Sequence, residues 1–71
     1  MKEVKVNGKV IEVEDHFNWL VNDVDGVVWV VAKRPIWNDD YKTWIPDGFG
    51  DMKILSAPDQ PIDQQATLTQ I

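Results

Sequence analysis

The chain has no cysteine, one histidine and one serine among its 71 residues. Without cysteine there is no disulfide and no Cys-based zinc or redox site, and His16 alone forms no histidine cluster for a transition metal. Ser56, the only serine, is far from His16 in the chain, so no nucleophile and base stand together in the sequence. We therefore expect no metal, no cofactor and no enzymatic activity.

The chain also lacks any apolar run near the roughly 20 residues that cross a bilayer, and it does not start with the basic-then-apolar pattern of a signal peptide. We expect a cytoplasmic protein that contacts no membrane. Seven basic against twelve acidic residues give a net charge of −5. That charge repels phosphate backbones, which argues against a nucleic-acid partner and favours basic protein partners.

Two turn signals between β-branched runs predict two hairpins. The first lies at Asn7-Gly8, because both residues suit the positive φ angles of a type I′ turn. A two-residue turn there pairs Val6 with Lys9 and sets the register of residues 2–6 against residues 9–13. In that register one face is apolar and is predicted to be core: Val4, Val6, Ile11 and Val13.

The second hairpin is predicted around Asp25-Gly26, and its return arm, residues 27–32, is apolar at every position. A strand that is apolar on both faces is typical of the centre of a sheet. The turn does not fit an EF-hand calcium loop, because the spacing would put Val21 and Ala32 at the first and last ligand positions.

The remaining segments are less regular. Residues 14–20 fit either a plain connection or a single helical turn, and both interpretations stay open. After the central strand, Pro35 stops strand pairing because it has no N–H to donate. The following segments are predicted in order as a loop (35–40), a strand (41–45), a turn (46–50) and a last strand (51–55).

Residues 56–71 differ in composition from the rest of the chain. They contain two prolines, four glutamines, no aromatic and no basic residue, and we expect a flexible, disordered tail. The domain is then residues 1–55. Its predicted fold is mainly β: a small antiparallel meander of five or six strands that forms an open barrel or a strongly twisted sheet.

Most of the large rings are predicted to be core. Trp29 lies in the central strand and Trp44 in its partner, while Phe17 and Trp19 share a face if the chain is extended there. Trp37 and Tyr41 are different, because they sit in a connection among acidic residues. Trp37 is either a lid over the core or an exposed ring, and the sequence leaves this open.

The middle of the chain, "NWLVNDVDGVVWVVAKRPIWNDDYKTW", resembles a pattern in short uncharacterised proteins of tailed bacteriophages. In that pattern a strand leads through D-x-D-G to an aromatic-bearing strand, then Lys or Glu, Pro, a polar loop and another Trp. The resemblance covers about a third of the chain and rests on these matching positions: Asp23, Asp25, Gly26, Trp29, Lys33, Pro35 and Trp44. It implies a small accessory protein made in the cytoplasm of a bacterial host, which acts by binding a host protein.

The function predicted from these observations is a non-enzymatic protein-binding module, such as a phage-encoded inhibitor of a host protein. Aromatic anchors with a polar rim are typical of interaction surfaces. The predicted partner-binding residues are Arg34, Trp37, Asp39, Asp40 and Tyr41. Two alternatives stay open: a β protein that assembles into a homo-oligomer through an unpaired sheet edge, and a module whose rings stack on carbohydrate.

Overall fold

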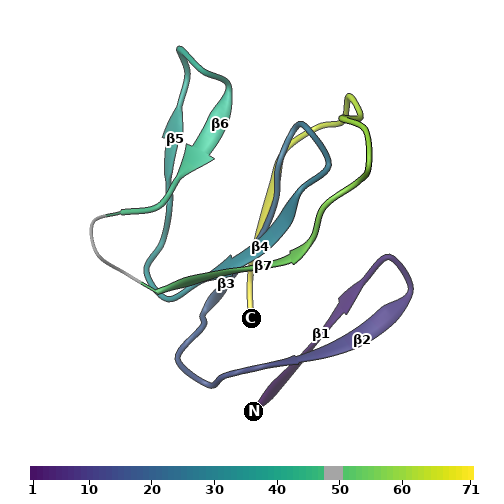
Figure 1. Ribbon diagram of the computed structural model, residues 1–71. Helices are drawn as coiled ribbons and strands as arrows, with labels where there is room; N and C mark the ends of the chain where they lie inside the picture. Colours follow the sequence, from purple (N-terminus) through teal and green to yellow (C-terminus); the bar gives the residue numbers. More distant parts are fainter. Residues whose placement is uncertain (48–50) are drawn as a thin grey trace.

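The computed structural model describes residues 1–47 and 51–71, and within them every regular element is a β-strand (Figure 1). The mainly β prediction is therefore confirmed. The strands form three antiparallel sheets, none of which closes into a barrel. In chain order they are β1 (Lys2–Val6), β2 (Lys9–Val13), β3 (Trp19–Asn22), β4 (Val28–Val31), β5 (Ile36–Asn38), β6 (Thr43–Ile45), β7 (Met52–Ser56) and β8 (Thr67–Gln70).

The β1–β2 hairpin has the predicted turn and the predicted register. Asn7 and Gly8 have φ angles of 51° and 81°, as a type I′ turn requires. Val6 faces Lys9 across the hairpin. On the face predicted to be core, Val4, Val6 and Val13 are buried and Ile11 is half-buried.

The largest sheet has the strand order β7-β4-β3-β8, with β4 inside it as predicted. All four residues of β4 are buried. Its hairpin with β3 turns at Gly26, whose φ of 92° suits a glycine. The Asp23 N–H donates to the Val27 carbonyl (2.9 Å) and the Gly26 N–H to the Asp23 carbonyl (3.1 Å), which closes the turn.

The two hairpins β1–β2 and β5–β6 lie on opposite sides of this sheet (Figure 1). On the β1–β2 side, Val28 and Val30 of β4 pack with the buried valines of that hairpin. On the other side, Trp29 and Val31 pack with Val21, as strand alternation requires. The domain therefore has two small cores, one on each face of a single sheet.

Phe17 and Trp19 do not share a face, which corrects the prediction made for them. Phe17 is buried in the core beside β1–β2, whereas Trp19 packs against the core on the opposite face. The reason is local, because the Phe17 N–H donates to the Glu14 carbonyl (3.1 Å) in a turn. The alternation of side chains between the two faces of the sheet therefore begins only at Trp19, the first residue of β3. Residues 14–18 form a connection without a helix.

Residues 35–40 were predicted as a loop, but Ile36–Asn38 form β5 and pair with β6. The strand predicted at 41–45 is shorter, Thr43–Ile45. The last predicted strand is present as Met52–Ser56. Residues 48–50 of the turn predicted at 46–50 lie outside the described residues. The described residues thus contain eight strands instead of five or six, because the predicted loop contains β5 and the predicted tail contains β8.

The segment predicted as a disordered tail contains β8, which pairs antiparallel with β3. Before β8 the chain crosses the β3–β4 turn, where the Ile62 N–H donates to the Asp25 carbonyl (3.2 Å) and the Gln64 N–H to the Val24 carbonyl (3.1 Å). The amino-acid composition of residues 56–71 does not reveal that this segment pairs with the sheet. The open edge of β3 offers backbone hydrogen bonds that need no particular side chains.

Candidate functional site

The β5–β6 hairpin carries four of the five residues predicted to bind a partner. Its register pairs Ile36 with Ile45 and Trp37 with Trp44. The two indole rings meet edge to face, with centroids 5.2 Å apart and planes at 68°. Such T-shaped pairs contribute about 0.5–1.5 kcal/mol beyond the area that they bury. This contact with Trp44 on the neighbouring strand fixes the position of the Trp37 ring.

Two contacts attach this hairpin to the four-stranded sheet. Trp44 packs against the core made by Val21, Trp29 and Val31. Its buried indole N–H has no acceptor among the described residues, so packing alone holds the ring. The Thr43 hydroxyl donates to the carboxylate of Asp23, at 2.8 Å from each oxygen. Asp23 is itself buried, so this bond compensates for the desolvation of its charge.

The tip of the hairpin is ordered by its own polar groups. The Asn38 side-chain oxygen accepts from the N–H groups of Asp40 (2.9 Å) and Tyr41 (3.0 Å). The Lys42 ammonium lies 2.8 Å from a carboxylate oxygen of Asp39, and Lys42 has a left-handed φ of 53°. These bonds fix the turn from which the Tyr41 ring projects.

The predicted partner-binding residues fall into two groups. Asp39, Asp40 and Tyr41 lie together at the tip and are exposed, with Tyr41 78% exposed. Trp37 lies in β5 and keeps 38% of its surface exposed, so it is both stacked on Trp44 and open to solvent. Arg34 lies at the other end of the hairpin, with its guanidinium carbon 5.6 Å from the Trp19 ring centroid.

Two exposed apolar residues of this hairpin were not among the predicted ones. Ile36 is 57% and Ile45 is 39% exposed, and they form a cross-strand pair. Alternation puts them on the opposite face of the hairpin from Trp37 and Trp44. The sequence does contain a sign of this pair, because "IWN" and "TWI" each join an Ile to a Trp as two paired strands could. The prediction of a loop at 35–40 excluded the first of these strands. We call Ile36, Trp37, Tyr41 and Ile45, with their acidic neighbours Asp39 and Asp40, the hairpin surface; it includes the tip and both faces of the hairpin.

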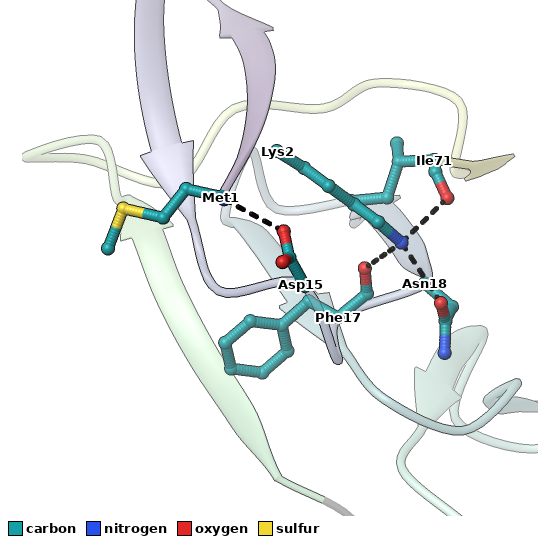
Figure 2. Close-up of polar contacts among 6 residues, drawn as sticks. All are labelled: Met1, Lys2, Asp15, Phe17, Asn18 and Ile71. Atoms are coloured by element: carbon teal, nitrogen blue, oxygen red, sulfur yellow. Dashed lines mark hydrogen bonds and ion pairs between the residues drawn. The ribbon is translucent and has the colours of Figure 1, made fainter.

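A polar cluster ties the ends of the described chain together at the other side of the sheet (Figure 2). The Lys2 ammonium donates to the Phe17 carbonyl (3.0 Å), to the Asn18 side chain (3.0 Å) and to the Ile71 carbonyl (3.2 Å). In this way β1 is linked to the connection before β3 and to the residue after β8. The role of this cluster is structural, because each bond satisfies a group of the fold.

An ion pair next to that cluster shifts the pKa values of both its groups. The Met1 amine lies 2.9 Å from an Asp15 carboxylate oxygen (Figure 2). Their hydrogen bond, and next the attraction between the charges, raises the pKa of the amine above its usual 8.0 and lowers the pKa of Asp15 below its usual 3.8. Both groups are exposed, so the pair is screened by solvent. The His16 Nε2 atom lies 3.0 Å from a carboxylate oxygen of Asp51.

Over residues 1–47 and 51–71, no three His, Asp or Glu side chains gather as metal ligands, and no pocket is present. None of these residues belongs to a helix long and apolar enough to cross a membrane. The most distinctive feature of the described surface is therefore the concentration of exposed apolar side chains on one hairpin.

Comparisons with known proteins give no relative from which to transfer a function. The chain matches no family model, no curated protein and no solved structure.

Proposed function

We propose that this protein is a non-enzymatic protein-binding module that docks through the hairpin surface. The observation that supports it most is the exposure of Tyr41, together with that of Ile36 and Trp37, on a hairpin held in place by Trp44. Trp and Tyr are enriched among residues that dominate binding energies. The bonds from Asn38 order the tip before binding, which lowers the entropic cost of docking.

The partner is a protein with an apolar surface bordered by basic residues. Asp39 and Asp40 flank Tyr41, and the whole chain has a net charge of −5. Like-charged surfaces are repelled and basic ones are attracted, which speeds association at low salt. The resemblance to tailed-phage accessory proteins is the reason to look for this partner among the proteins of a bacterial host, where binding would inhibit the protein bound.

The test is affinity capture from a bacterial lysate with matched variants as bait. Tyr41→Ala removes an exposed ring and is expected to lose the partner, with affinity falling about 30-fold or more as for a hot-spot residue. Val10→Ala removes an exposed apolar side chain from β2 and is expected to retain the partner. Capture that is equal for both variants would contradict the proposal.

Trp37→Ala distinguishes an anchor from a lid. If Trp37 is an anchor, the variant keeps a cooperative urea transition and loses the partner. Loss of the folded state would instead assign the ring to the core. A titration with soluble oligosaccharides, followed by tryptophan fluorescence, separates protein binding from the carbohydrate alternative. Saturable quenching by a sugar that Tyr41→Ala abolishes would favour carbohydrate.

A further inference from the structure

The two edge strands of the four-stranded sheet differ in how they are protected from pairing. Natural edges carry charges, prolines or bulges that prevent the addition of another strand. β7 has Lys53 and an irregular register opposite Val28 and Trp29. β8 pairs with β3 in a regular register, and residues 64–71 contain no charged side chain and no proline. Of the two edges, β8 is thus the unprotected one.

Within residues 1–47 and 51–71, no strand pairs with the outer side of β8. The Ile71 N–H donates to the Asn18 carbonyl. Because the hydrogen-bonding direction alternates along an antiparallel pair, the N–H groups of Thr67 and Thr69 also face β3. The N–H and C=O groups of Leu68 and Gln70 face the open edge, and Thr67, Thr69 and Gln70 have exposed side chains.

We propose that β8 pairs antiparallel with β8 of a second copy of this chain, joining two four-stranded sheets across a two-fold axis. The outward groups allow a register in which Leu68 faces Leu68 of the second copy. Thr67 then faces Thr69 of the second copy, and the reverse pair forms by symmetry. Apolar pairs and Thr–Thr pairs are both favourable across strands.

The occupant is a second copy because the β8 edge is self-complementary: with Leu68 at the two-fold axis, the outward backbone groups of each copy meet the same groups of the other. The net charge of the chain opposes any such dimer, but it opposes pairing at β8 least. Any dimer of a chain with net charge −5 brings like charges together. Pairing through residues 64–71 places a segment without charged side chains at the contact in both copies, which keeps the repulsion between side chains smallest. Each copy uses its β8 edge once, so the assembly closes at two.

The dimer is expected to be weak. Four residues of paired strand bury less surface than the about 1,200–2,000 Å² of a stable interface. The experiment is therefore sedimentation equilibrium from about 10 μM to about 1 mM, where weak association is detectable. The mass is expected to rise from 8.2 kDa towards twice that value with increasing concentration. A monomer throughout the series, or a species larger than a dimer, would overturn the proposal.

A charge placed on either edge identifies the strand that pairs. Thr69→Glu adds a like charge to both copies at the contact and is expected to weaken the dimer tenfold or more. Ile54→Glu adds the same charge to β7, at a residue that is also exposed, and is expected to leave the dimer unchanged. Equal weakening by the two variants would show that β8 is not the contact.

Amide hydrogen exchange gives a second readout in the unmodified protein. At high concentration the amides of Leu68 and Gln70 are expected to exchange several-fold more slowly than in dilute solution. The Thr69 amide faces β3 and serves as the internal control, with little change. Concentration-independent exchange at Leu68 would contradict the β8 contact. This proposal does not rest on the hairpin surface, so either can fail without the other.

Discussion

The β1–β2 and β5–β6 hairpins cover opposite faces of the same sheet, but they distribute their apolar side chains differently. β1–β2 buries Val4, Val6 and Val13 against the sheet and leaves its polar face in water. β5–β6 packs Trp44 against the other core and leaves Ile36 and Tyr41 exposed. The same motif thus completes a core in one place and displays apolar surface in the other.

The largest expected effect comes from placing the same charge on both hairpins. Val13→Asp puts a carboxylate at a fully buried position without a partner, at a cost of about 3–5 kcal/mol. A chain of this size has about 4–10 kcal/mol in total, so most of its stability is lost. Ile36→Asp, at an exposed position, is expected to cost less than about 1 kcal/mol. Urea unfolding measures both.

If Ile36→Asp destabilised the protein as strongly as Val13→Asp, the β5–β6 hairpin would be part of the core. The two hairpins would then not differ in how they use their apolar side chains. The hairpin surface would stabilise the fold and would not be available to a partner.

A smaller effect is expected from releasing the β5–β6 hairpin from the sheet. Thr43→Val removes the hydroxyl that donates to Asp23 and leaves a buried carboxylate without that bond, at a cost of about 1–3 kcal/mol. Thr67→Val makes the same change at an exposed position of β8 and is expected to cost less than about 0.5 kcal/mol. The midpoints of thermal unfolding, compared at equal concentration, check the difference. Equal midpoints would mean that Asp23 does not depend on this hairpin.

The smallest expected effect concerns the exposed pair of Met1 and Asp15. Because the pKa of Asp15 is lowered, its contribution is present above pH 3.8 and is lost as the pH falls through the folded value. Because the pKa of the amine is raised, its contribution is present below pH 8.0 and is lost as the pH rises through the folded value. Asp15→Asn is therefore expected to lower the unfolding midpoint slightly between those limits. A difference that persists at pH 2 would assign it to another cause.

Some elements follow from local sequence. The Asn7-Gly8 turn fixes the φ angles at two residues, and the side-chain period of two then determines which face of β1–β2 is buried. The burial of β4 follows in the same way from an apolar run between turn signals. These predictions succeed because turn chemistry and alternation act over a few residues.

The candidate site was only partly predictable. The exposed Tyr41 follows from its acidic neighbours, but Ile36 was hidden by the interpretation of residues 35–40 as a loop. A Pro before a short apolar segment signals a loop as readily as a new strand. Only the pairing of Trp37 with Trp44 shows that this segment is a strand. Arg34 was grouped with the tip by closeness in sequence, whereas it lies over Trp19.

The amino-acid sequence by itself determined that this protein is mainly β, where its first two hairpins turn and which strand is buried on both faces. The tertiary structure decided what the rest of the chain does: that β8 completes the edge of β3, and that residues 36–38 form a strand paired with β6. The physical reason is the distance along the chain over which each interaction acts. Turn angles and alternation are settled between near neighbours, whereas an open backbone edge can be filled by any segment that reaches it.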